Sequence, residues 1–267
     1  MTPGEAAAGP GRFEALNAFF DRILVVTLAR AKDRQARLRE RLAGLRYELL
    51  LGFDKAQLDF AALARDGVYD PARARAVDRH GREMKPGEVG CSLSHRKIYA
   101  DAVREGWGRV LVLEDDAVPH VEAMAGAAEA LGELPEGWEL VYLGWENFET
   151  VTLRDRLKQA AYVGMAAARL MKWTPSQILR FHPRPFSPHL KTAGLHHCTH
   201  AYAFTTAGAR KLLEAQTPTA YVADQLLIHL ILSGQLRAFV MEPQLFGQER
   251  HAMTADELKS ESFVTQR

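Results

Sequence analysis

The chain has 267 residues, 47% of them hydrophobic and 25% charged, with a formal net charge of +1 at pH 7. These values are typical of a soluble globular protein, and the nearly balanced charge argues against nucleic acid as a partner. Only two cysteines occur, Cys91 and Cys198. A secreted disulfide framework is therefore not expected, and reduced thiols in a cytosolic protein are favoured over a single disulfide.

The chain opens with Gly, Ala and Pro, and residues 1–12 are predicted to form a disordered tail before one domain over 13–267. This opening lacks the apolar core of a signal peptide, and no apolar run in the sequence is long enough to span a bilayer. A short helix follows the tail. Buried strands are then predicted over 22–28 and 47–53 with a helix between them, which is the opening of a parallel α/β sheet.

The middle of the chain continues this alternation. A helix is predicted over 94–105, a strand over 109–113, a helix over 121–131 and a strand over 138–143. Sheets of this kind bind ligands beyond the carboxyl ends of their strands. The residues at such ends are Asp54, Glu114, Asp116 and Gly144.

Three acids in a row, Glu114, Asp115 and Asp116, follow directly on the apolar run 110–113. Side chains alternate between the faces of a strand, so Glu114 and Asp116 are expected to point to the same side. Two carboxylates together at a strand end form a hard-oxygen site that suits Mg²⁺ or Mn²⁺. The pattern predicts a metal-assisted enzyme acting on a phosphate-bearing compound; the alternative is a strand end capped by solvated acids.

Residues 151–195 differ in composition from the rest of the chain. A single acid, Asp155, stands among the cations Arg154, Arg156, Lys158, Arg169, Lys172, Arg180, Arg184 and Lys191. Prolines and aromatic residues are interleaved, and the prolines argue against a rigid helix pair. We predict a basic insertion that serves as a lid or arm for an anionic ligand; the alternative is a solvated insertion.

The last part of the chain is again typical of a folded core. A strand is predicted over 201–204, helices over 206–215 and 223–232, and a short strand over 238–241. A group just before the first of these strands matches no common zinc spacing. Its members are His196, His197, Cys198 and His200. A packed turn is predicted there, with one imidazole facing the cleft.

A block upstream of the acids carries a family resemblance. Together with the acids its residues are Gly87, Glu88, Gly90, Cys91, Ser94, His95, Glu114, Asp115 and Asp116. In order and spacing they resemble glycosyltransferase family 25, which includes bacterial lipooligosaccharide galactosyltransferases and collagen galactosyltransferases. Weaker matches extend the resemblance across most of the chain; they are Tyr202, Thr206, Gly208, Ala209, Asp224, Pro243, Gln244 and Gln248.

The resemblance implies an α/β fold of the GT-A type with a mostly parallel central sheet, a nucleotide-sugar donor and a divalent cation, Mn²⁺ or Mg²⁺. The cation is needed because charge builds on the diphosphate that leaves the sugar. Asp116 is the first choice of ligand, and Glu114 is expected to bind through water or to contact the ribose. His251 is a further metal ligand by analogy with bacterial relatives; the alternative is a surface histidine on a mobile tail.

The resemblance also implies an inverting reaction, which needs a general base on the acceptor hydroxyl. Asp224, just before a leucine-rich stretch, is the candidate that matches best, and Glu146 is in reserve. The alternative for Asp224 is an ordinary helix N-cap.

The residues that follow the first predicted strand, Leu28 and Arg30 among them, resemble the first donor-binding segment of the family. Arg34 is expected to reach a phosphate of the donor, and Asp54 is expected to hold its base or ribose. Each of them has an alternative role as a brace of the sheet.

Ser94 and His95 are expected to open a helix whose N-terminal amides favour anions, with Glu88 fixing His95 in place. Glu114 and Asp115 complete the candidate donor site. The alternative for Ser94, His95 and Glu88 is again structural bracing.

We therefore predict a bacterial, cytoplasmic glycosyltransferase that moves a hexose, with galactose favoured, from a UDP sugar to a glycan acceptor. Lipopolysaccharide core, a lipid-linked glycan, is the favoured acceptor, with peripheral contact at the inner membrane surface. The rival from another class is a catalytically silent module that binds a nucleotide sugar or a glycan. A nucleotidyltransferase is disfavoured because residues 27–34 contain no glycine.

Overall fold

The computed structural model describes residues 11–249, so His251 and most of the predicted tail lie outside it. The strands are β1 (Arg22–Thr27), β2 (Glu48–Leu51), β3 (Arg109–Glu114), β4 (Ala117–Pro119), β5 (Leu140–Glu146), β6 (Arg184–Pro185), β7 (Leu190–Thr192), β8 (His197–Thr205), β9 (Ala238–Met241) and β10 (Phe246–Gln248). The helices are α1 (Glu14–Phe19), α2 (Lys32–Arg41), the 3-10 turn η1 (Lys55–Gln57), α3 (Phe60–Arg65), α4 (Pro71–Val77), α5 (Pro86–Glu105), α6 (Val121–Met124), α7 (Ala127–Gly132), α8 (Leu153–Ala167), α9 (Pro175–Ile178), α10 (Thr206–Ala215) and α11 (Ala223–Leu232). Within this described part, no helix combines the length and apolar character that crossing a membrane requires.

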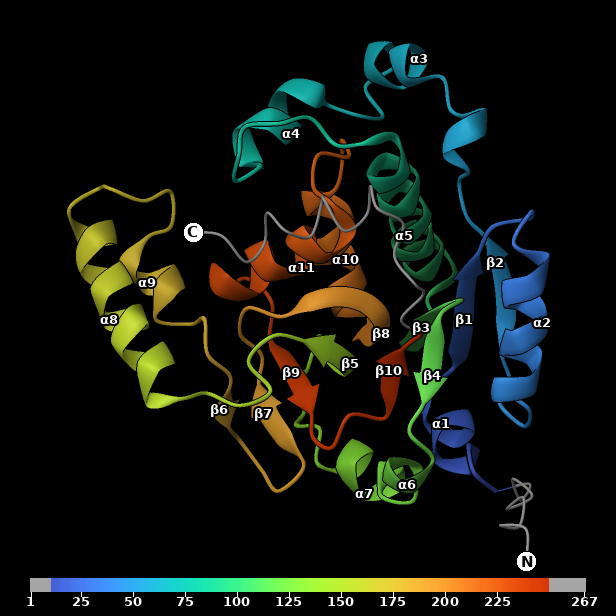
Figure 1. Ribbon diagram of the computed structural model, residues 1–267. Helices are drawn as coiled ribbons and strands as arrows, with labels where there is room; N and C mark the ends of the chain where they lie inside the picture. The colour runs from blue at the N-terminus through green and yellow to red at the C-terminus, as the bar shows by residue number, and fades with distance from the viewer. Residues whose placement is uncertain (1–10, 250–267) are drawn as a thin grey trace, which may run out of the picture.

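One eight-stranded sheet in the order β2-β1-β3-β8-β5-β9-β7-β6 forms the centre of the molecule (Figure 1). β1 pairs in parallel with β2 and β3, and β5 pairs in parallel with β9. β8 lies between β3 and β5 and runs antiparallel to both. The predicted α/β class with a large, mostly parallel central sheet is confirmed, although β8 at its centre and β7 near one edge run antiparallel to their neighbours.

Helices cover both faces of this sheet. α1, α2 and α7 pack on one face, and α5, α10 and α11 pack on the other. In β3, Leu111 and Leu113 face the first group while Val110 and Val112 face the second, and all four are fully buried. The apolar run in the sequence is therefore a strand buried on both faces, and it delivers the three acids to the carboxyl end of the sheet.

The helix that carries Ser94 and His95 begins earlier than predicted. α5 starts at Pro86 and runs for 20 residues, with Glu88 Oε2 accepting a hydrogen bond of 2.6 Å from the amide of Lys85. Proline at the first position and an acid in the first turn both favour a helix start. Ser94 and His95 consequently lie in mid-helix, and the expectation that they open a helix and offer its free amides to an anion was wrong.

The two glycines in the first turns of α5 have different surroundings. A Cβ on Gly90 would lie 2.5 Å from the backbone oxygen of Phe53, whereas a Cβ on Gly87 would meet nothing within 4 Å. We expect Gly90→Ala to lower the free energy of unfolding by about 1 to 3 kcal/mol, because α5 and the segment after β2 must separate. Gly87→Ala is the matched control and should raise it by up to about 1 kcal/mol. Urea unfolding measures both, and equal stabilities would contradict the close packing at Gly90.

Residues 151–195 form an ordered arm, so the expectation against a helix pair was wrong. Thr152 and Asp155 accept hydrogen bonds from each other's amides at the start of α8, and α9 packs against α8. Every proline of the arm lies beyond α8 and leaves its hydrogen bonds intact. β6 and β7 then extend the sheet past β9. Because Asp155 caps α8, the one acid among these cations already has a structural role.

Candidate functional site

Glu114, the last residue of β3, is held by two neighbours. Thr199 of β8 donates its hydroxyl to Glu114 Oε1 at 2.5 Å, and His95 Nε2 lies 3.4 Å from the same oxygen. Burial works against the charged carboxylate, but His95 and Thr199 outweigh it and hold the pKa of Glu114 below its ordinary value. Glu114 is therefore a fixed anion at neutral pH.

Asp115 ties the ends of two strands together. It is buried, and its carboxylate accepts a hydrogen bond of 2.7 Å from the hydroxyl of Thr27 at the end of β1. Arg34 of α2 donates to the other oxygen at 3.1 Å. Arg34 thus contacts an acid of the cluster, and its expected reach to a phosphate stays a prediction.

Asp116 is the acid whose charge is least compensated. Gln248 donates to Asp116 Oδ2 at 2.9 Å, while the buried Oδ1 has no hydrogen-bond partner among residues 11–249. Burial, with the nearby charge of Glu114, raises the pKa of Asp116 to about 6. A buried carboxylate oxygen without a partner, beside a second carboxylate, fits a divalent cation such as Mn²⁺ or Mg²⁺.

The end of the described chain lies against this acidic cluster. β10 pairs antiparallel with β4, and the amide of Glu249 donates to the backbone oxygen of Asp116 at 2.7 Å. His251 follows two positions later and lies outside the described residues. Its role as a metal ligand stays a prediction.

The predicted donor residues at the ends of β1 and β2 contact one another. Arg30 Nε lies 2.5 Å from Asp54 Oδ2, and Asp54 Oδ1 caps η1 by accepting from the amide of Ala56. The hydrogen bond from Arg30 lowers the pKa of Asp54. The backbone oxygen of Leu28 accepts from the Gln35 amide group at 2.8 Å. These contacts form a braced turn beside the acidic cluster.

The hydroxyl of Ser94 forms hydrogen bonds with backbone groups of the fold. Its Oγ accepts from the amide of Phe53 at 2.8 Å and donates to the backbone oxygen of Gly90 at 2.7 Å. This is the bracing role that was its alternative. His95 is also buried, but its contacts with Glu114 and with Tyr202 Oη, 2.7 Å from Nδ1, place it beside the acids.

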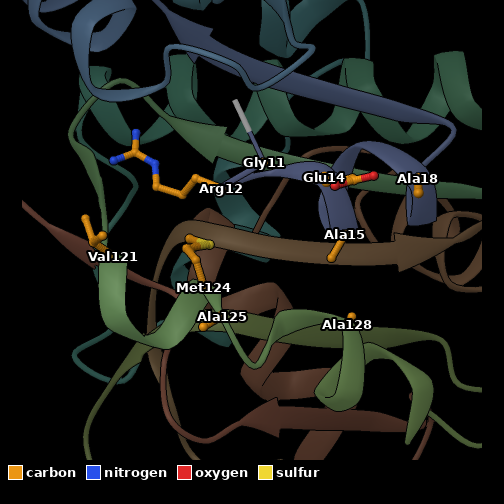
Figure 2. Close-up of a pocket in the computed structure, with 9 residues that line it drawn as sticks. All are labelled: Gly11, Arg12, Glu14, Ala15, Ala18, Val121, Met124, Ala125 and Ala128. Atoms are coloured by element: carbon orange, nitrogen blue, oxygen red, sulfur yellow. The ribbon is translucent and has the colours of Figure 1, made fainter. Parts of the chain in front are cut away.

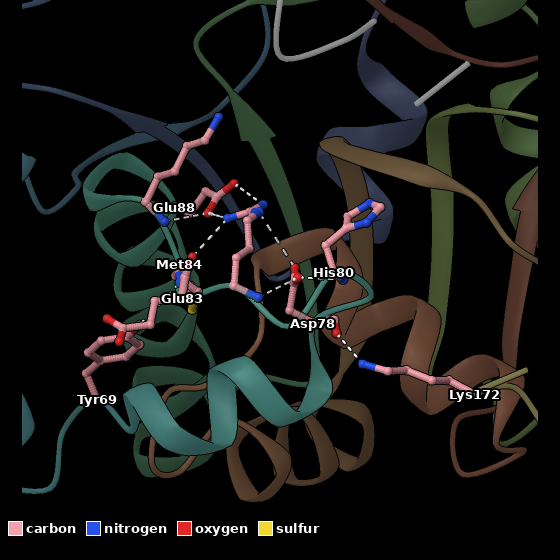
Figure 3. Close-up of polar contacts among 9 residues, drawn as sticks. Tyr69, Asp78, His80, Glu83, Met84, Glu88 and Lys172 are labelled. Carbon is pink, nitrogen blue, oxygen red and sulfur yellow. Dashed lines mark hydrogen bonds and ion pairs between the residues drawn. The ribbon is translucent and has the colours of Figure 1, made fainter. Parts of the chain in front are cut away.

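Glu88 does not contact His95, so its expected role in fixing that imidazole was wrong. Glu88 instead forms a bidentate pair with Arg82 of the loop before α5, at 2.7 and 2.8 Å. The same loop contacts the arm of residues 151–195, because the Lys172 ammonium donates a hydrogen bond to the backbone oxygen of Asp78 at 3.0 Å (Figure 3). The arm therefore contacts the segment that leads into α5.

Asp224 is the second residue of α11, and Val222 occupies the N-cap position without a side-chain cap. The N-cap alternative for Asp224 was therefore wrong. Its Oδ2 lies 3.5 Å from Nδ1 of His197, the first residue of β8. A half-buried carboxylate beside an imidazole is a pair suited to accepting and passing on a proton.

β8 contacts three carboxylates on both sides of Cys198, because Glu146 pairs with His197, Asp224 lies 3.5 Å from His197 and Thr199 donates to Glu114. Burial raises the pKa of the Cys198 thiol, and the charges of Glu146, Asp224 and Glu114 raise it further. These acids end β5, begin α11 and end β3. The fold thus brings both candidate bases close to the acidic end of β3.

Thr199 is the contacting residue of this site that the sequence reasoning missed. It is a single polar residue without a spacing pattern, 85 positions from the Glu114 that it contacts. His197 and Gln248 were named in sequence, as one of the clustered histidines and as a family match, but no pattern predicted their contacts with Asp224 and Asp116.

The histidines around Cys198 belong to a strand, so the predicted turn was wrong. His197 and His200 lie within β8, and His196 directly precedes it. The buried His196 donates from Nδ1 to the backbone oxygen of Asn147 at 3.0 Å, which fits packing.

A groove of about 440 Å³ lies away from the acids, between α1 and the α6–α7 pair (Figure 2). Its lining combines four alanines with Gly11, Arg12, Val121 and Met124, and its one acid is Glu14. Because none of the clustered carboxylates lines it, the candidate site stays at the end of β3.

A buried strand that ends in acids at the carboxyl side of an α/β sheet is typical of enzymes that bind phosphate-bearing ligands. Residues 20–227 match the family described as glycosyltransferase family 25 (LPS biosynthesis protein), and the chain belongs to this family. The resemblance carried by the motif around Cys91 and the acids is confirmed.

Three animal proteins illustrate the similarity. The chain is 33% identical over 207 residues to the human "Inactive glycosyltransferase 25 family member 3", covering 74% of this chain and 29% of that protein. It is 30% identical over 203 residues to a "Glycosyltransferase 25 family member" of Anopheles gambiae, covering 73% and 28%. It is 27% identical over 139 residues to "Procollagen galactosyltransferase 1" of Danio rerio, covering 49% and 22%. The match thus spans less than a third of each relative.

Proposed function

We propose that this family 25 protein is an active, metal-dependent, inverting glycosyltransferase with a GT-A-type fold. It moves a hexose, with galactose favoured, from a UDP sugar to a glycan. The state of Asp116 carries the proposal. Its carboxylate has a buried oxygen without a hydrogen-bond partner in the described part of the chain, and its pKa is raised beside the ionised Glu114. Such an arrangement costs stability in the absence of a cation and suits a site that binds one.

The cation, Mn²⁺ or Mg²⁺, would be held by Asp116 and Glu114, with His251 as a further ligand. When bound, it neutralises charge on the leaving diphosphate. Arg34 is close enough to the cluster to add a second positive charge there, because it contacts Asp115 at 3.1 Å. The braced turn of Leu28, Arg30 and Asp54 would hold the nucleoside.

Asp224 is the proposed general base. It would take the proton from the acceptor hydroxyl, and His197 at 3.5 Å holds the carboxylate in position. Glu146 at the end of β5 is the reserve candidate, since it pairs with His197, the residue that contacts Asp224.

The proposed acceptor is a lipid-linked glycan such as lipopolysaccharide core, reached at the cytoplasmic face of a bacterial inner membrane. α8 supports this setting, because Leu153 and Leu157 are 73% and 64% exposed beside Arg154, Arg156 and Lys158. Exposed apolar side chains among cations are typical of segments that lie on anionic lipid.

The second candidate is a catalytically silent module that binds a nucleotide sugar or a glycan. The name of the human relative, which calls it inactive, favours this alternative. The complete set Glu114, Asp115 and Asp116, with a candidate base nearby, favours the active enzyme.

A donor-hydrolysis screen across UDP, GDP and CMP sugars tests the proposal. We expect slow release of UDP from UDP-galactose with Mn²⁺, loss of activity in EDTA, and recovery when Mn²⁺ is restored. Thermal stabilisation by UDP sugar and Mn²⁺ without any hydrolysis or transfer would support the silent module. Neither stabilisation nor hydrolysis with any donor would overturn both candidates.

A further inference from the structure

Cys91, His95 and Glu114 form a second group of possible metal ligands beside the candidate site. Cys91 and His95 are four residues apart on α5 and therefore share one face of the helix, and Glu114 ends the neighbouring β3. One ligand atom of each residue lies within 4.8 Å of the others. Ligands around a tetrahedral zinc ion are roughly 3.5 Å apart, so small side-chain shifts bring these three into range.

His95 is oriented as a metal-binding histidine would be. Its Nδ1 lies 2.7 Å from Tyr202 Oη, which in turn lies 2.9 Å from Tyr99 Oη. In the metal-free protein Nε2 lies 3.4 Å from the anionic Glu114 Oε1, which favours the tautomer with the ring proton on Nε2. A cation bound between them favours the other tautomer, in which Nδ1 donates to Tyr202 and Nε2 offers its lone pair to the metal. His95 is 1% exposed, and its Nε2 makes no hydrogen bond of ordinary length in the described part of the chain. A partner on one ring nitrogen and a free second nitrogen is the arrangement that metal-bound histidines adopt.

The surrounding charge favours a cation at this place. A carboxylate oxygen of Glu114 lies within 4.8 Å of the Cys91 sulfur, and Asp116 follows Glu114 by two residues at the same end of β3. These carboxylates attract a divalent cation, which would displace the thiol proton into solvent as the metal–sulfur bond forms.

We propose that Cys91, His95 and Glu114 bind a thiophilic divalent cation such as Zn²⁺, at a site separate in chemistry from the oxygen site at Asp116. Sulfur and imidazole ligands select Zn²⁺, whereas carboxylate oxygens select Mg²⁺ and Mn²⁺. Since Glu114 belongs to both sites, Zn²⁺ bound here withdraws a carboxylate from the oxygen site. Binding itself does not depend on the proposed transferase activity, but the resulting inhibition does.

Titration of the reduced, metal-free full chain with Co²⁺ tests the site through the thiolate-to-cobalt charge-transfer band. We expect one equivalent of Co²⁺ to produce the band and Zn²⁺ to displace it. Cys91→Ser should abolish the band, and His95→Gln should weaken Co²⁺ binding by at least about tenfold. Cys198→Ser is the matched control and should keep the band.

Two further measurements keep the test decisive. Zn²⁺ should slow alkylation of Cys91 but not of Cys198 in the unmodified protein, which mass spectrometry resolves without any variant. Asp116→Asn should keep the cobalt band even if it loses Mn²⁺-dependent UDP binding, which separates this site from the proposed function. No band in the wild-type protein, a band that survives in Cys91→Ser, or equal protection of both cysteines would overturn the proposal.

Discussion

Replacing Asp116 with asparagine is expected to abolish sugar transfer and Mn²⁺-dependent UDP binding while stabilising the cation-free protein. The loss follows because Asp116 is the proposed direct ligand. The gain follows because burial and Glu114 raise the pKa of Asp116 from 3.8 to about 6, so its ionised form opposes folding.

The pH dependence of this gain has a definite sign. Below about pH 4 Asp116 is protonated in both states, and the variant should match the wild type. As pH rises to 6 the wild type loses stability relative to Asp116→Asn, and above pH 6 the difference stays constant at about 1 to 3 kcal/mol. Thermal unfolding from pH 4 to 8, without metal and with Mn²⁺ and UDP, measures both effects.

Asp115→Asn is the matched control for this substitution. The carboxylate of Asp115 accepts hydrogen bonds from Thr27 and Arg34. Removing its charge should therefore lower the free energy of unfolding by about 1 to 3 kcal/mol. Opposite signs for neighbouring acids would support the distinct roles assigned to them. Unchanged Mn²⁺-dependent UDP affinity in Asp116→Asn would refute the metal assignment.

Asp224→Asn is expected to lower turnover by about 10² to 10⁴-fold and to leave donor affinity within a few-fold of the wild type. A general base acts on the acceptor hydroxyl in the transition state and contributes little to nucleotide binding. Steady-state transfer rates, together with calorimetric titration of UDP and Mn²⁺, separate the two effects.

Glu146→Gln is the control for Asp224→Asn, because both acids neighbour His197, Glu146 through strand pairing and Asp224 at 3.5 Å. It should retain turnover within a few-fold of the wild type. If Glu146→Gln loses turnover and Asp224→Asn does not, the base is Glu146. If both retain it, neither carboxylate is the base.

The fold was predictable where one local pattern decided the structure. The run 110–113 had to be a buried strand, and leucine spacing indicated α11. α5 was predicted to start at residue 94, yet it starts at Pro86 and includes Gly90, where a side chain would collide with the backbone of Phe53. The arm was misjudged because its prolines, although numerous, all lie outside α8. The average composition of a segment does not show at which positions its prolines interrupt a helix.

The site was predictable only for residues that share a strand end. The apolar run placed Glu114 at the end of β3, whereas Asp115 and Asp116 lie in the turn that follows, beyond the strand. The run gave no information on what surrounds each acid. Thr199 and Gln248 contact them across 85 and 132 positions of sequence, and such contacts depend on strand order. The antiparallel insertion of β8 brings Thr199 and His197 to the acids, and local sequence carries no signal for that topology.

The position of β8 has a consequence for how the chain folds. β8 is the link that joins the strands β2, β1 and β3 to the strands β5 and β9, and it comes after residue 196 in the sequence. During synthesis, the backbone groups of β3 and β5 that pair with β8 therefore stay unpaired until the ribosome has released most of the chain. Late closure of long-range pairs slows folding and exposes apolar edges to aggregation. Fragments that stop before β8 should accumulate as insoluble material, and chaperones that bind extended apolar segments should engage the nascent chain in this interval.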